Sequence, residues 1–279
     1  MSRKEKMTTS TDELDAVIAQ CIELCGKDAE RLPAEGQLQE LRRLLEEYQC
    51  KTTPTAEDCR TNRRWAGQLQ QLAERILRVP VNKVPPSTTS LTLLILAEGI
   101  QIFGIDWFRD NVQLLVLTAH MNTVELRLLL DKPEVIPPEP FAAFCSILEF
   151  CIQCVETADF VPDEPALQLA KNIGEAVNFV VEFWTDCAQY NINLSNEVNA
   201  CIYRLAICVV AVTGQNMIRP ELFKKAAIML VRECTRQLNS KQLQTSRHIL
   251  TVLDEITDAL RGNEDVKQEL ADLMNRLHI

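Results

Sequence analysis

The segment LLVLTAHMNTVELRLLL, residues 114–130, is apolar on almost every side of a helix. Proline-rich segments lie on both sides of it, at residues 80–86 and 133–140. A helical segment that is apolar all round must be covered by other elements. Asn122 and Thr123 interrupt the apolar run, and threonine is a good helix cap. We therefore predict a kink near Asn122 and a buried pair of helices, with other helices packed around them.

The composition of the whole chain predicts an all-α protein. Hydrophobic residues make up 47% of the sequence, and only eight glycines occur among 279 residues. Good helix formers with few glycines favour helices over strands. A chain of this length buries roughly 75% of the surface that its unfolded form exposes. We therefore expect it to fold without disulfides or a metal.

Charge and cysteine content restrict the classes of partner and the compartment. The net charge is −10, which disfavours nucleic acid as a partner because phosphate binding needs a dense cationic face. The eleven cysteines lie at helical spacings in apolar runs, as Cys21 and Cys25 do. This pattern is typical of small buried hydrophobes and not of a disulfide framework. It predicts a reducing compartment and cytoplasmic localisation.

Signals for export or membrane insertion are weak. The N-terminal MSRKEKMTTSTDEL has no apolar core behind its basic residues, so we do not expect a signal peptide. The apolar window at residues 91–97 is too short to span a bilayer, and Arg204 interrupts the window at residues 200–212. We therefore expect a soluble chain that is not transmembrane.

Apolar residues recur at three and four residues along much of the chain, which predicts successive helices. Pro220 is expected at the start of one of them. The predicted apolar stripe of the second helix consists of Leu38, Leu41, Leu44, Leu45 and Tyr48. Ser10 followed by Glu13 predicts a capping box at the start of the first helix. Adjacent prolines predict a loop over residues 80–90, with the next helix starting near Ser90. Asp106 is the expected cap of the helix after Gly104, and Ser195 is another expected cap.

Helix starts recur at similar intervals in the second half of the chain. Those near Phe141, Ser195 and Thr245 are about 50 residues apart, close to the helix-pair spacing of HEAT and armadillo arrays. The predicted fold class is an all-α, irregular armadillo/HEAT-like α-solenoid of helical hairpins. We predict an N-terminal helical unit at residues 1–80, which packs on the rest or stands apart, and an armadillo-like array at residues 87–279.

Five arginines share one side of a predicted helix that begins near Thr55. They are Arg60, Arg63, Arg64, Arg75 and Arg78. Their spacing corresponds roughly to whole helical turns. Two interpretations stay open: a solvated face of an acidic protein, or a docking stripe for an acidic peptide or a phosphate group. We take this stripe as the candidate partner-binding site.

Motifs for catalysis, metals and nucleotides are missing from the sequence. Cys151 and Cys154 form the one CxxC, without the second pair that a zinc site usually has. No G-x-S-x-G elbow, P-loop or G-x-G-x-x-G occurs. We therefore predict no catalytic residue, no metal site and no cofactor, and we expect a non-enzymatic protein. A curved helical array offers a long surface for binding other proteins.

Three segments resemble the neurochondrin family. They are residues 124–127 (VELR), residues 141–154 (FAAFCSILEFCIQC) and residues 170–177 (AKNIGEAV). The resemblance covers roughly residues 91–235, and residues 1–80 and 240–279 are not placed by it. It implies an armadillo-like, non-enzymatic adaptor linked to neurite outgrowth and calmodulin-dependent kinase signalling. The family has no catalytic residues to carry over.

The function predicted from the sequence is that of a cytosolic adaptor or regulator that binds another protein on its helical surface. One alternative is peripheral association with anionic lipid through the same arginine stripe. The other is an enzyme whose site is assembled in space from distant residues.

Overall fold

The computed structural model describes residues 3–25, 31–51, 64–132, 136–240, 247–261 and 264–277. These residues form eleven α-helices, four 3-10 helices and no strand. The α-helices are α1 (Arg3–Leu24), α2 (Glu35–Lys51), α4 (Arg64–Leu77), α5 (Pro86–Phe103), α6 (Val112–Leu130), α7 (Pro138–Thr157), α8 (Asp163–Gln189), α9 (Asn196–Thr213), α10 (Pro220–Asn239), α12 (Leu253–Ala259) and α13 (Glu264–Leu277). The 3-10 helices are η1 (Val81–Lys83), η2 (Ile105–Phe108), η4 (Gly214–Met217) and η5 (Arg247–Val252). The predicted fold class, an all-α helical-repeat solenoid, is confirmed.

Contacts divide the chain into two compact units. The first comprises Met1–Glu125 with Thr157–Leu169, and the second Leu126–Glu156 with Ala170–Ile279. Helix α5, which follows the proline-rich segment, packs on α2 and α4 within the first unit. The division into domains at residues 1–80 and 87–279 stays a prediction, because packing alone does not show which parts fold on their own.

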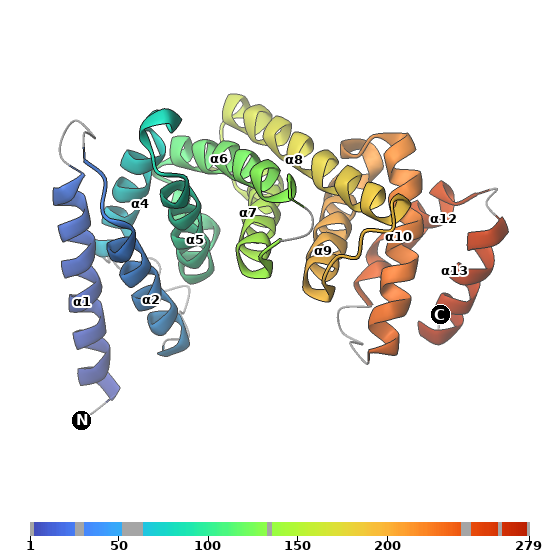
Figure 1. The fold of residues 1–279 in the computed structure, drawn as a ribbon, viewed down its shortest axis with the longest axis horizontal. Coiled ribbons are helices and arrows are strands. Elements are labelled where there is room, and N and C mark those ends of the chain that lie inside the picture. The colour runs from blue at the N-terminus through green and yellow to red at the C-terminus, as the bar shows by residue number, and fades with distance from the viewer. Residues whose placement is uncertain are drawn as a thin grey trace. The chain divides into compact units, whose positions relative to one another are not determined.

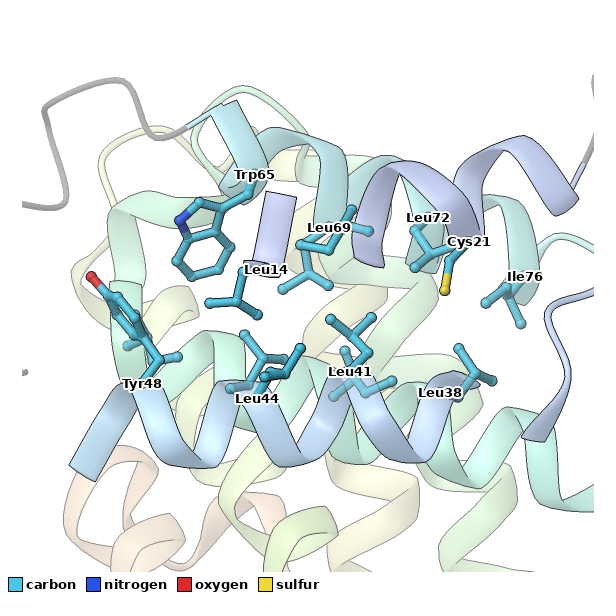
Figure 2. Packing of buried hydrophobic residues seen from close by; sticks show 14 of the residues in the cluster. Leu14, Cys21, Leu38, Leu41, Leu44, Tyr48, Trp65, Leu69, Leu72 and Ile76 are labelled. Carbon is cyan, nitrogen blue, oxygen red and sulfur yellow. The ribbon is translucent and has the colours of Figure 1, made fainter. Parts of the chain in front are cut away.

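Helices α1, α2, α4 and α5 lie side by side and enclose the core of the first unit (Figure 1). The predicted apolar stripe of α2 is confirmed, since Leu38, Leu41, Leu44, Leu45 and Tyr48 are all buried. In Figure 2 this stripe faces side chains of α4. They include Leu69, Leu72 and Ile76, which are also buried.

Trp65 is the largest side chain of this core, and the sequence analysis missed it. It is fully buried, and its ring lies 5.4 Å from that of Tyr48 and 4.9 Å from that of Phe103. Its four-residue spacing to Leu69 carried the signal.

Two predicted helix starts are wrong. Helix α1 begins at Arg3, so Ser10 lies inside the helix and not at its cap. The residues before Ser10 include arginine, lysine, glutamate and methionine, which are good helix formers and extend the helix. Helix α5 begins at Pro86, within the predicted loop. Proline is favoured at the first helical position, because its missing N–H would have no partner there.

The central stretch forms one helix, α6, and the predicted pair of helices is wrong. The Thr123 hydroxyl donates a 2.9 Å hydrogen bond to the Ala119 carbonyl one turn earlier, so it does not cap a new helix. Asn122 is fully buried.

Asp106 lies in η2, and the cap of α6 is Asn111, whose Oδ1 accepts from the Leu114 N–H at 3.1 Å. Serine, threonine and asparagine are ambiguous in sequence because each hydroxyl or amide also bonds within a helix.

In the second unit, side-chain hydrogen bonds join α9 to both α8 and α7. The Trp184 indole N–H of α8 donates to Asn199 Oδ1 of α9 at 2.9 Å. Arg204 of α9 donates to Glu149 of α7 at 2.7 Å. The predicted cap at Ser195 is confirmed, since its hydroxyl accepts from the Val198 N–H at 3.2 Å. Helix α10 packs on α9, α12 and α13.

Helices α7 and α9 are long and apolar enough to cross a membrane by length and composition alone. The structure buries 50% of the α7 window and 44% of the α9 window. Core helices of a folded domain pass the same test, so length and composition alone are weak evidence for a membrane span.

Candidate functional site

The structure describes part of the predicted arginine stripe. Arg60 and Arg63 lie outside the described residues, and Arg64 is the first residue of α4. Arg75 lies in the last turn of α4, and Arg78 follows that helix directly. The five-residue stripe therefore stays a prediction, and the geometry of its C-terminal end is defined by Arg75 and Arg78.

Arg75 has a structural role. Its guanidinium donates a 3.3 Å hydrogen bond to the carbonyl of Ile22, in the last turn of α1. Carbonyls in the last turn of a helix have no partner within that helix. Arg75 therefore links the last turn of α1 to α4 by a hydrogen bond. Its positive charge also opposes the rise that burial causes in the pKa of Cys25.

Arg78 is held more loosely. It forms an ion pair of 2.7 Å with Glu74, one turn earlier on α4, and its side chain is 62% exposed. The second carboxylate oxygen of Glu74 accepts from the Asn111 amide at 2.8 Å. Surface ion pairs of this kind contribute little stability. The guanidinium of Arg78 is therefore accessible to a competing anion.

Arg75 and Arg78 line a cavity of about 770 Å³ in the first unit, which we call the basic cavity. The other lining residues come from the segments before α2 and α5, from the starts of those helices, and from η1. They are Leu32, Pro33, Ala34, Glu35, Val79, Pro80, Lys83, Pro85, Ser87 and Thr88.

Lys83 is the third cation of the basic cavity. It ends η1, and its N–H donates to the Pro80 carbonyl at 2.8 Å. Its side chain is exposed, and no ion pair with it occurs in the part of the chain that the structure describes. The sequence analysis missed Lys83 because the segment was interpreted as a loop with no function, and a single lysine there carries no periodic signal.

Glu35 supplies the one carboxylate among the residues that line the basic cavity. It is the first residue of α2, and its two oxygens accept from the Ser87 hydroxyl at 2.9 Å and the Gln39 amide at 3.0 Å. The starts of α2 and α5 thus meet at the same carboxylate. Helix N-termini favour negative charge, and Glu35 occupies such a position at the start of α2.

Other groups offer little chemistry. Burial raises the pKa of Cys154 to about 12 and raises that of Cys151 further, so both are thiols at neutral pH. No cluster of three or more metal-ligating side chains occurs in the ranges that the structure describes. A second cavity, of about 600 Å³, lies between α10 and α13 in the second unit. Its charges are mixed, with Arg232 paired to Glu269 at 3.4 Å.

Fold and cavity define a helical-repeat protein of the armadillo/HEAT class with a cationic cavity in its N-terminal helices. The Neurochondrin family model matches residues 4–267, and the chain therefore belongs to the Neurochondrin family. A search of curated proteins finds no match.

The family match is much wider than the resemblance at residues 91–235 and includes every residue that lines the basic cavity. Short motifs underestimated its extent because core positions accept exchange among apolar residues of similar volume. Residues 4–80, which the motifs did not place, belong to the matched range.

Proposed function

We propose that this chain is a non-enzymatic cytosolic adaptor or regulator that binds other proteins through its helical-repeat surface. Membership of the Neurochondrin family supports this class. The observation that carries the proposal is the basic cavity, where Arg78 and Lys83 stay accessible on a protein of net charge −10. The proposal includes the signalling role that the family resemblance implies, in neurite outgrowth and calmodulin-dependent kinase pathways.

Cytosolic placement is proposed from the cysteines. Cys21, Cys25, Cys151 and Cys154 are buried thiols without a disulfide. Such thiols are typical of proteins from reducing compartments.

Affinity capture from cell lysate tests the adaptor proposal. The bait is the full chain, compared with a variant carrying Arg78→Glu and Lys83→Glu, and with the five-arginine variant in which residues 60, 63, 64, 75 and 78 become glutamate. Arg43→Glu is the control, since Arg43 lies on α2 in the same unit, pairs with Glu40 and Glu47, and does not line the cavity.

The expected result is a stoichiometric partner that the wild type and Arg43→Glu retain and both other variants lose. The partner is then identified, and binding is repeated with the two purified proteins. Equal capture by all variants would move binding to another surface. Capture of nothing by the wild type would contradict the adaptor proposal.

Binding to anionic lipid is the weaker alternative. A lipid-binding surface needs its cations on a face that a flat membrane can reach. Arg75, Arg78 and Lys83 instead line one cavity. The net charge of −10 also opposes approach to an anionic surface. We expect the chain to remain in the supernatant when it is sedimented with phosphatidylserine vesicles.

A further inference from the structure

We propose that the basic cavity binds a phosphorylated serine or threonine in a segment of a partner protein. This inference rests on the proposed adaptor function, because it names the chemical class of partner that the candidate site recognises. It is carried by three cationic side chains that line one cavity, Arg75, Arg78 and Lys83.

The charge of the cavity suits a compact dianion. Arg75, Arg78 and Lys83 supply three positive charges, and Glu35 supplies one negative charge. The phosphoryl group of a phosphoserine carries about −1.5 to −2 charges at pH 7 and offers three acceptor oxygens. Arginine pairs with phosphate through two parallel hydrogen bonds, and lysine contributes a point charge. Glu74 neutralises Arg78 in the structure, so the charge left by the three cations and Glu35 matches one phosphoryl group once that group has displaced Glu74 from Arg78.

The start of helix α5 also favours an anion at the cavity. Ser87 and Thr88 are among the lining residues, and both lie in the first turn of α5. The Ser87 hydroxyl already donates to a carboxylate oxygen, that of Glu35. The positive end of the α5 dipole adds to the field of the cations.

Prolines and a backbone hydrogen bond restrain the wall of the cavity. Pro33, Pro80 and Pro85 form part of its wall, and proline fixes its own φ angle. The Thr88 N–H donates to the Pro85 carbonyl at 2.9 Å, which ties the wall to the start of α5. A site whose groups are already in place loses less conformational entropy when the ligand binds, which increases its affinity.

An extended acidic peptide fits less well. The described cations meet at one end of α4, and carboxylates lie beside them: Glu35 lines the cavity and Glu74 pairs with Arg78. A row of carboxylates would place several separate charges against these acids, whereas one phosphoryl group concentrates its charge at the cations and competes with Glu74 for Arg78.

Fluorescence anisotropy with two labelled peptide libraries tests the proposal. The libraries have the same degenerate flanking positions and differ only in a central phosphoserine or serine. The full-length wild type is expected to bind the phosphoserine library at least tenfold more tightly. Arg78→Gln with Lys83→Gln is expected to remove at least tenfold of that affinity. Arg43→Gln, the matched control on α2, is expected to change it less than twofold.

Glu35→Gln tests for a gain in phosphopeptide affinity, which a misfolded variant would not show. Glutamine still accepts from Ser87 but carries no charge, so phosphopeptide affinity is expected to rise about threefold or more. Thermal unfolding of each variant shows that it is folded. Arg75 is left unchanged, because its bond to Ile22 stabilises α1.

Three outcomes would overturn the proposal. Equal affinity for both libraries would mean that the cavity does not recognise the phosphoryl group. Phosphopeptide binding that is unchanged in the double variant would place the site elsewhere. Binding of phosphatidylserine vesicles in place of phosphopeptides, lost in the same variant, would assign it to lipid. If phosphopeptides fail while lysate capture still identifies a partner, the adaptor function stands and the phosphate assignment falls.

Discussion

Gly99 illustrates how one residue permits the packing of the first unit. A Cβ atom at Gly99 would lie 2.3 Å from Cη2 and 2.6 Å from Cζ3 of Trp107. The indole is held in place, since its N–H donates to the Ala66 carbonyl at 3.3 Å and its ring packs on Phe103 and Phe108. The helix therefore requires glycine where α5 meets this ring.

We expect Gly99→Ala to lower the free energy of unfolding by about 1–3 kcal/mol, the usual cost of overpacking. Urea denaturation measures it. Gly67→Ala is the control, because Gly67 is a helical glycine with no atom within 4 Å of the added methyl. It should gain up to about 1 kcal/mol from helix propensity. A gain in both variants would mean that the indole moves aside freely.

Leu115 and Leu128 lie on the same helix, α6, in opposite environments. Leu115 is fully buried and Leu128 is 64% exposed. We expect Leu115→Ala to cost roughly 2–5 kcal/mol and Leu128→Ala to change stability by less than about 0.5 kcal/mol. Differential scanning calorimetry compares the two. An unchanged melting temperature for Leu115→Ala would contradict the central position of α6.

At the scale of elements, the start of α6 depends on a cap that the sequence did not identify. Asn111 caps the helix and also donates to Glu74 at 2.8 Å. Asp106, the predicted cap, pairs instead with Arg109 on the surface at 2.8 Å. We expect Asn111→Ala to cost about 1–2 kcal/mol and Asp106→Ala less than about 0.5 kcal/mol in thermal unfolding. The reverse order would restore Asp106 as the cap.

Helices α7 and α9 are joined by an ion pair that is partly shielded from water. Burial raises the pKa of Glu149, and the nearby guanidinium of Arg204 only partly offsets this. Because the folded state holds the Glu149 proton more tightly than the unfolded state, ionised Glu149 lowers stability at neutral pH. This cost disappears as the pH falls below the ordinary carboxyl value.

We therefore expect Glu149→Gln to raise the free energy of unfolding at pH 7, with a gain that shrinks to nothing near pH 4. Arg204→Leu should cost roughly 1–3 kcal/mol at pH 7, because it leaves the carboxylate without its partner. The expected loss of stability is smaller than that for breaking a fully buried ion pair, because the Arg204 side chain is 44% exposed. Urea denaturation across this pH range measures both. A loss of stability in Glu149→Gln at pH 7 would show that the pair is net stabilising.

At the scale of the whole molecule, the chain is a series of helices that contact their near neighbours. Leu41 lies in the core formed by α1, α2, α4 and α5. In repeat arrays each unit is stabilised mainly by its neighbours. We expect Leu41→Ala to raise amide hydrogen exchange in these four helices and to leave α10 and α13 unchanged. Uniform loss of protection in all described helices would indicate a single cooperative unit.

Much of the fold was predictable because helix periodicity is local. The stripe of α2, the cap at Ser195 and proline at the start of α10 follow from residue types within a few positions of each other. The predicted helix starts at Ser10 and Thr123 failed, because hydroxyl side chains suit both a cap and a helix interior. The resemblance in residues 91–235 correctly identified the family, which extends over residues 4–267.

By itself, the sequence determined the all-α class, the helical periodicity and the family, since these depend on the types and spacing of residues along the chain. Tertiary structure decided what those residues do. In the folded chain, Arg75 donates a hydrogen bond to the Ile22 carbonyl, and Arg78 stays accessible. Lys83 reaches the same cavity from η1, which follows α4 in the chain. The physical reason is that a binding cavity requires side chains from several helix ends to meet, and that meeting depends on how the helices pack.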